Sequence, residues 1–170
     1  YINGYQPDWS DDISDRLQNC LPFPMHPMEV NFELETFHNP ERGQYHSTLL
    51  LAQLLKELPD KEHKIIGVTS VDLFIPVLTF VFGESQLDGN GAVISTYRLR
   101  NEFYGLPQDI EQLVDRTTKE ALHELGHAFG LVHCPNYECV MNSSTYVEDI
   151  DIKQARLCEE CQSELGVSCD

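Results

Sequence analysis

The stretch from His123 to Cys134 constrains the fold of this chain more than any other, because it demands a helix that stops at a fixed place. It reads His-Glu-Leu-Gly-His-Ala-Phe-Gly-Leu-Val-His-Cys. Histidines at positions i and i+4 lie on one face of a helix. A straight helix cannot bring a third histidine, six residues further on, to the same point. Because glycine tolerates a positive φ at a helix end, Gly130 is expected to end the helix and let the chain turn back with His133.

Three imidazoles that meet in this way predict a metal site. His123, His127 and His133, with a water in the fourth position, match the tetrahedral ligand set of a catalytic zinc. Glu124 directly follows the first histidine, so its carboxylate is expected to activate the zinc-bound water as a general base. Two histidines at this spacing also occur by chance on solvated helices, but Gly130 and His133 at fixed offsets disfavour that interpretation of the full pattern.

Four cysteines after the third histidine form a second group of potential ligands. Cys134 and Cys139 make one close pair, and Cys158 and Cys161 make another. Four thiolates match a closed, structural zinc site, which would tie the loop after the histidines to a C-terminal helix. Two disulfides or a redox-active Cys-x-x-Cys remain as alternatives. Zinc is favoured because no secretory signal is visible in the sequence.

Hydrophobic periodicity predicts a long helix over about residues 108–130. At about 100° per residue, the apolar side chains of this helix fall in one sector, and Arg116 and Lys119 fall roughly opposite. His123 and His127 lie with the polar sector. The helix is therefore expected to bury one side in a core and to present its imidazoles to a cleft.

Shorter elements are expected on both sides of this helix. Leucines at helical spacing predict a helix over residues 44–58, which Pro59 ends. Strands are expected at residues 28–32, 64–69, 78–82 and 92–97. Prolines make the first forty residues look irregular. A last helix is expected over residues 151–165, with Asp149 or Asp151 as its cap.

Composition narrows the possible partners. The formal charge is −17 over 170 residues, and the acidic residues are spread along the chain. Such a surface repels phosphate backbones, so nucleic-acid binding is disfavoured. No apolar stretch is long enough to span a membrane, and a cytoplasmic monomer is expected. Two further cysteines, Cys20 and Cys169, are either free or paired.

The run from His123 to Cys161 resembles the archaemetzincin signature, in the metzincin clan of zinc metallopeptidases. It combines the long zinc motif, a cysteine directly after the third histidine, the Cys139-Val140-Met141 triplet and a closing Cys-x-x-Cys. The segments 66–83 and 103–107 are also similar to the family. The resemblance implies one α+β domain over residues 1–170. An upper part, residues 1–133, would hold a twisted mixed sheet and two long helices. A smaller irregular lower part, residues 134–170, would end in a helix.

The resemblance also implies roles for individual residues. Met141 would be the methionine of the turn beneath the zinc site, where it gives the imidazoles an apolar floor. Residues 92–97 would be the strand that lines the cleft and pairs with an extended peptide. Several metzincins have a tyrosine near the metal two residues beyond this methionine. Ser143 occupies that position here. Tyr146 is close in sequence and could assist the oxyanion, but a plain loop tyrosine is the favoured interpretation.

The expected function is hydrolysis of peptide bonds in a peptide or protein substrate, with two zinc ions per chain, one catalytic and one structural. One alternative is a non-catalytic zinc-binding or interaction protein on the same scaffold. Another is hydrolysis of a non-peptide amide at the same zinc. Glu124 favours an enzyme, because a scaffold has no need for a base at that position.

Overall fold

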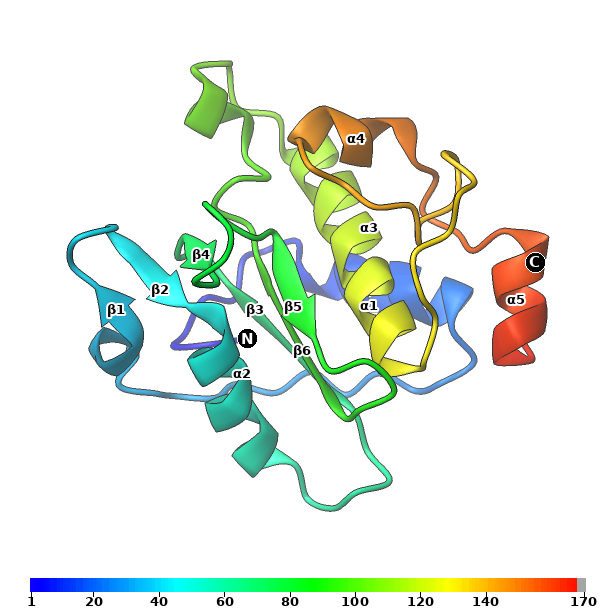
Figure 1. Ribbon diagram of the computed structural model, residues 1–170, viewed down its shortest axis with the longest axis horizontal. Helices are drawn as coiled ribbons and strands as arrows, with labels where there is room; N and C mark the ends of the chain where they lie inside the picture. Colours follow the sequence, from blue (N-terminus) through cyan, green and yellow to red (C-terminus); the bar gives the residue numbers. More distant parts are fainter. Residues whose placement is uncertain (168–170) are drawn as a thin grey trace.

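The computed structural model of the chain describes residues 1–167, and it is built around two small sheets (Figure 1). The central sheet has the order β3 (Ile65–Thr69), β6 (Gly91–Ser95), β5 (Gly83–Ser85). β6 runs parallel to β3 and antiparallel to β5. The second sheet has the order β1 (His38–Asn39), β2 (Gln44–His46), β4 (Leu73–Phe74). Each sheet therefore combines one parallel and one antiparallel pair of strands. β5 is an edge strand of the central sheet.

Five α-helices and three 3-10 helices complete the described part of the chain. The α-helices are α1 (Ser10–Cys20), α2 (Ser47–Leu54), α3 (Ile110–Ala128), α4 (Val147–Ile152) and α5 (Glu159–Leu165). The 3-10 helices cover Leu34–Phe37, Leu55–Glu57 and Asn101–Tyr104. No helix within residues 1–167 combines the length and the apolar character needed to cross a bilayer. The predicted α+β class is confirmed.

The central sheet is covered by helices on both faces. Alternate residues of β6 point to opposite sides, so Val93 packs into the core with α2 while Ile94 packs into the core with α3. α1 adds Ile13 and Leu17 to the core on the α3 side. In Figure 1, α4 and α5 lie on the side of α3 away from α2. Helix α3 is thus held between the sheet and the C-terminal segments.

Several predicted elements differ from the structure near the N-terminus. The prediction of irregular structure over the first forty residues is wrong for residues 10–20, which form α1. The predicted strand 28–32 is reduced to a single parallel bridge between Val30 and Ile2. The predicted helix 44–58 begins at Ser47 instead, because Gln44–His46 pair with β1 and β4 as a strand.

The predicted strand 78–82 is also wrong, since the strand begins at Gly83. The segment before it makes one bridge, between Val81 and Leu73. The carbonyl groups of Leu78 and Thr79 accept hydrogen bonds from the Arg42 guanidinium rather than from a neighbouring strand. A side chain therefore satisfies the backbone groups that a sheet would otherwise pair.

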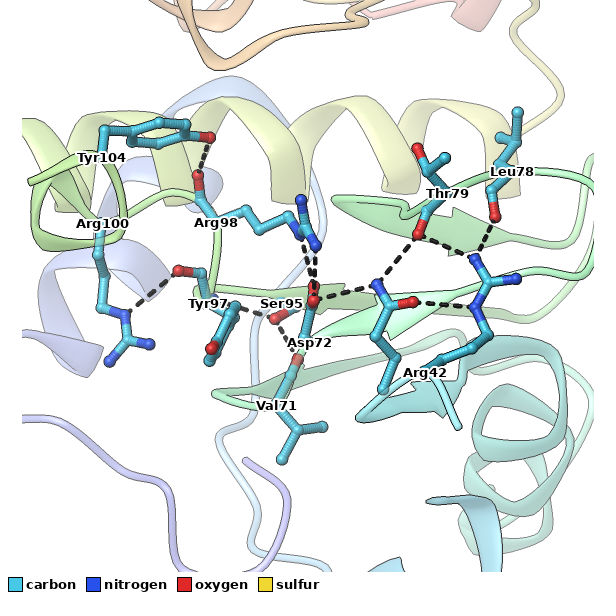
Figure 2. A network of polar contacts seen from close by, with 11 residues as sticks. Arg42, Val71, Asp72, Leu78, Thr79, Ser95, Tyr97, Arg98, Arg100 and Tyr104 are labelled. Atoms are coloured by element: carbon cyan, nitrogen blue, oxygen red, sulfur yellow. Dashed lines mark hydrogen bonds and ion pairs between the residues drawn. The ribbon is translucent and has the colours of Figure 1, made fainter. Parts of the chain in front are cut away.

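A polar network, buried at Gln44 and Asp72 and exposed at Arg42, holds this segment in place (Figure 2). Asp72 accepts two hydrogen bonds of 2.7 Å from Arg98 and a third, of 3.0 Å, from the Gln44 amide. Arg42 bonds to the Gln44 side chain and to two carbonyl groups of residues 75–82. Bidentate, charge-assisted hydrogen bonds are stronger than neutral ones. The network therefore fixes the chain that leads directly into β5.

The single C-terminal helix predicted over residues 151–165 is two helices, α4 and α5. Between them, the amide of Gln154 donates to Glu138 and the carbonyl of Arg156 accepts from Val140. Leu157 is 1% exposed. The chain leaves the helix there because its backbone pairs with the loop after α3. The predicted cap is wrong: the N-cap of α4 is Tyr146, and Asp149 lies in the first turn, where it accepts hydrogen bonds from the backbone amides of Thr145 and Tyr146.

The polar sector of α3 is buried, which the helical projection did not foresee. Arg116 is 4% exposed and Lys119 is 6% exposed. Arg116 makes two 2.7 Å hydrogen bonds to Asp151 of α4 and one of 2.8 Å to the carbonyl of Leu99. α4 thus covers this side of α3, and ion pairing compensates for burial of the charges.

The expected role of residues 92–97 as a cleft-lining strand is wrong. β6 pairs with β3 on one side and with β5 on the other, and all five of its residues are buried. A strand with both edges occupied cannot take up a further peptide. β5 lies at one edge of the sheet in the described chain, and β3 lies at the other, where the amide of Ile2 donates to the carbonyl of Val68.

Candidate metal centres

The carboxyl end of α3 brings the three histidines together. The helix begins at Ile110, where the Asp109 side chain accepts a hydrogen bond from the amide of Gln112. It ends at Ala128, and Gly130 adopts φ +100°. The amide of Leu131 then donates to the carbonyl of Gly126 over 3.0 Å, as in the Schellman termination of a helix. The predicted break at Gly130 is therefore present.

The three imidazoles face one point. Nε2 of His123 and Nε2 of His127 are 3.1 Å apart, and the ligand atoms of His123, His127 and His133 all lie within 4.8 Å of one another. Nδ1 of His123 donates to the Val140 carbonyl over 2.8 Å, and Nδ1 of His127 donates to the Leu131 carbonyl over 2.7 Å. Because carbonyl oxygens only accept, these bonds leave both Nε2 atoms free to bind a cation.

The surroundings keep two of these histidines neutral. Burial lowers the pKa of His123 to about 3, helped by the positive charge of Lys153. The pKa of His133 is also lowered, by burial and by His127 and Lys153. A metal binds the neutral imidazole, not the imidazolium. The surroundings therefore favour, for His123 and His133, the neutral form that binds a cation.

Glu124 is buried between these histidines and strand β5. The side chain is 6% exposed. Burial raises its pKa to about 8, and the nearby charge of Glu120 adds to the rise, whereas a hydrogen bond with the Ser85 side chain lowers it. A Cβ atom placed on Gly83 would lie 2.7 Å from Cγ of Glu124 and 2.9 Å from its Oε1. Glycine at position 83 is thus what allows β5 to pass this close to the carboxyl group.

The Cys139-Val140-Met141 triplet packs directly beneath α3. Met141 is fully buried, and its carbonyl accepts a 2.9 Å hydrogen bond from the amide of Cys134. A Cβ atom on Gly126 would overlap with Sδ of Met141. Gly126 lies between His123 and His127 on the helix, so the methionine contacts the helix at the level of the two imidazoles.

The four cysteines form a second cluster. Sγ of Cys134 lies 3.7 Å from Sγ of Cys158, and Sγ of Cys139 lies 3.8 Å from Sγ of Cys161. A disulfide would require about 2.05 Å, so neither pair is bridged. Four sulfurs around one zinc at about 2.3 Å are separated from one another by about 3.8 Å. The observed spacing suits one tetrahedral metal better than two disulfides.

Other residues singled out in the sequence are less closely tied to these clusters. Tyr146 is 66% exposed and precedes α4, so a part in stabilising an oxyanion stays an alternative to a plain loop tyrosine. Sγ of Cys20 donates to the carbonyl of Ala155 over 3.1 Å. Cys169 lies outside the described residues, so whether it pairs with Cys20 is not tested.

Sequence reasoning missed three residues beside the histidines. Glu120, one turn before Glu124, is 5% exposed. Burial raises its pKa to about 7, while the positive charge of Lys153 acts to lower it. Lys153, which follows α4, is 3% exposed. Ser85 bonds to Glu124 from β5. The i, i+4 spacing of the two glutamates was a usable signal for Glu120, but the sequence carries none for Lys153 or Ser85.

Comparison with known proteins identifies the family. The profile of Peptidase family M54 matches residues 13–166. The chain belongs to this family. It is 48% identical over 128 residues to the archaemetzincin of Methanocaldococcus jannaschii, an alignment that covers 75% of this chain and 69% of the relative.

Solved structures of similar proteins agree with the fold. The crystal structure of archaemetzincin from Methanopyrus kandleri superposes with a TM-score of 0.83 at 33% identity, covering 97% of this chain and 91% of that one. A structure described as a zinc-dependent peptidase from Methanocorpusculum labreanum has a TM-score of 0.87 at 32% identity, covering 96% and 97%. The resemblance to archaemetzincins, the metzincin-like α+β fold and the assignment to a family of zinc-dependent peptidases are confirmed.

Proposed function

We propose that this M54 chain hydrolyses peptide bonds with a zinc ion held by His123, His127 and His133, with Glu124 as the catalytic base. One observation carries the proposal. The Nε2 atoms of His123 and His127 are free to bind a metal because their Nδ1 atoms already donate to carbonyl groups. They meet the His133 imidazole beside the buried carboxyl group of Glu124. The donor set fits zinc, which prefers imidazole nitrogen in a tetrahedral site with one open position.

The chemistry divides between the metal and Glu124. A zinc ion at this site would act as a Lewis acid and bring the pKa of water close to neutrality. The Glu124 carboxylate accepts the proton of the attacking water and then delivers it to the amide nitrogen that leaves. Burial raises the pKa of Glu124, which makes it a better proton acceptor once it is ionised. A nearby cation favours that ionised form.

Strand β5 supplies a docking edge for the substrate. The amide of Gln86 donates to Gly91 and the amide of Ser95 donates to Phe82, so alternate residues of β5 bond to β6. By this register, the backbone groups of Gly83 and Ser85 point away from β6. An extended peptide that pairs with them would lie along the strand that passes Glu124.

Replacing Ser85 by proline should weaken peptide binding by removing the outward amide while sparing the sheet. Edge strands tolerate proline on the unpaired side. One lost hydrogen bond of about 0.5–1.5 kcal/mol corresponds to a rise in KM of about two- to twelvefold. Ser85→Ala is the control, because it keeps the amide and loses only the hydroxyl that bonds to Glu124. Equal KM values for the two variants would remove β5 as the docking edge.

We further propose a second, structural zinc held by Cys134, Cys139, Cys158 and Cys161, which makes two zinc ions per chain. The spacing of the sulfurs supports it. On this view Met141 forms the apolar floor of the histidine site, and the chain divides into residues 1–133 and 134–170, with the cysteine site fastening the second part. A monomer is the assembly proposed, since each site draws its ligands from one chain.

The test of peptidase function is turnover of a mixed peptide library by the zinc-loaded protein. We expect cleavage by the loaded protein, loss of at least about 100-fold of the rate after dialysis against a chelator, and recovery on adding zinc. Product masses read by mass spectrometry also separate cleavage within peptides from removal of terminal residues. A library left intact by the zinc-loaded protein would favour a non-catalytic zinc-binding protein or a non-peptide amide as substrate.

A further inference from the structure

The last carbonyl groups of α3 receive hydrogen bonds from outside the helix. A helix leaves its final carbonyls without intrahelical donors. Two of the donors are residues that directly follow the helix: the amide of Leu131 donates to the carbonyl of Gly126, and the amide of Gly130 donates to the carbonyl of His127. The remaining donors are the turn that follows β5 and Lys64, which bonds to that turn.

Lys64 is the first of these donors. It lies immediately before β3, and its Nζ atom donates to the carbonyl of Ala128 over 2.9 Å and to the carbonyl of Gly89 over 2.6 Å. The same ammonium group lies 4.8 Å from the centre of the Phe129 ring. An ammonium has three hydrogens, so two carbonyls and one aromatic face occupy it. Its positive charge also suits the carboxyl end of a helix.

The turn between β5 and β6 is the second donor. The amide of Asp88 donates over 2.9 Å to the carbonyl of His127, and Asp88 adopts φ +51°. Gly89, which accepts from Lys64, belongs to the same turn. In Figure 1 this turn lies beside the carboxyl end of α3. The backbone of a proposed zinc ligand is thus bonded directly to the turn that ends the proposed docking strand.

We propose that Lys64 is a positioning residue, which clamps the β5–β6 turn to the carboxyl end of α3 and so holds β5 at a fixed place relative to His127 and Glu124. This inference rests on the proposed function of the histidine site and of β5. Lys64 bonds at once to the turn, at Gly89, and to the helix, at Ala128. Asp88 is itself part of the turn, so its bond to the helix depends on where the turn lies. Without the ammonium, the turn keeps its bonds from Asn90 to the carbonyls of Lys61 and His63 but only one hydrogen bond to α3, from Asp88, so its contact with the helix is the one that loosens.

The sign of the effect on zinc separates this clamp from a simple charge effect. Removing a positive charge near a zinc site should strengthen zinc binding if only Coulomb repulsion is at work. Loosening the backbone that carries His127 should weaken zinc binding, because residues that orient a ligand typically change metal affinity by about 10–100-fold. The clamp therefore predicts the opposite change from electrostatics.

The test compares Lys64→Met, Lys64→Arg and the control Lys56→Met, which removes an exposed lysine bonded only to the Gln53 side chain in the described chain. Zinc release to a chromophoric chelator is followed, and the phase that is absent in His127→Ala reports the histidine site. We expect Lys64→Met to release this zinc about tenfold faster. KM for a cleaved peptide should rise about three- to tenfold with a smaller change in kcat. Lys64→Arg should restore both values to within about threefold, because a guanidinium can also reach two carbonyls.

Amide hydrogen exchange of residues 86–91 gives a readout that needs neither zinc nor turnover. It should be faster in Lys64→Met than in the wild type and in Lys56→Met. Slower zinc release, or exchange and KM values equal to those of Lys56→Met, would overturn the clamp. A wild type without a His127-dependent zinc phase or turnover would overturn the proposed function instead, and exchange of the turn would still decide for or against the clamp.

Discussion

Glu124→Gln should reduce peptide hydrolysis by about 10²–10⁴-fold while the protein keeps its zinc. The amide has nearly the shape of the carboxyl group and can still bond to Ser85, but it cannot accept a proton from water. Because burial already disfavours the charged form of Glu124, the variant should melt at or above the wild-type temperature. The measurements are initial rates on a peptide that the wild type cleaves, zinc per chain, and the melting temperature.

Glu111→Gln is the matched control for this experiment. Glu111 lies in the first turn of the same helix and is exposed, so its variant loses one carboxylate without touching the site. We expect wild-type rates from it. A Glu124→Gln protein that cleaves peptides as fast as Glu111→Gln would rule out a base at position 124, whatever its zinc content.

The histidine and cysteine clusters could be predicted because their geometry is local. The distance between His123 and His127 follows from the pitch of one helix. Residue 130 is a glycine, the residue type that most readily adopts the positive φ needed to turn the chain back. The structure places all three imidazoles together. Cys158 and Cys161 lie within one helical turn of each other, and only the pairing with Cys134 and Cys139 needed the fold. Short spacings carry most of this information.

The surroundings of the site could not be predicted, because they depend on contacts between distant segments. Arg116 and Lys119 look like a solvated face, and they are buried only because Asp151 of α4 lies opposite. β5 is three residues long and begins with a glycine. Its course is determined by Glu124 on one face and by hydroxyl groups of α2 that bond to Glu84 on the other.

A signal for α1 was present in the sequence. Ile13, Leu17 and Leu21 recur at intervals of four residues, and all three are buried in the core. The prolines on both sides of residues 10–20 hid this period, although prolines outside a helix limit its length and do not forbid it. A cluster of prolines was therefore weaker evidence against a helix than a buried stripe was in its favour.

Removing one ligand from each cluster should separate the roles of the two metals. We expect about two zinc ions per wild-type chain and about one in both His127→Ala and Cys161→Ser. His127→Ala should lose all measurable turnover. Its stability should fall by less than that of Cys161→Ser, because two of the three histidine ligands lie on one helix, whereas the cysteine ligands join α5 to the loop after α3. Zinc content is measured by metal analysis of dialysed protein.

Cys161→Ser should cause the larger loss of stability. Cys161 is 6% exposed on α5, while Cys139 lies in the loop that supports His123 through the Val140 carbonyl. Structural zinc contributes about 10–16 kcal/mol of binding free energy in small zinc-binding domains, comparable to the whole stability of a typical domain of about 5–15 kcal/mol. Even a loss of about 4 kcal/mol would lower the melting temperature by about 10 °C in a chain of this size.

Because the cysteine loop carries the acceptor for Nδ1 of His123, this variant should also lose turnover while it retains zinc at the histidines. A Cys161→Ser protein that melts like the wild type, or that still contains two zinc ions, would show that the four cysteines hold no structural metal.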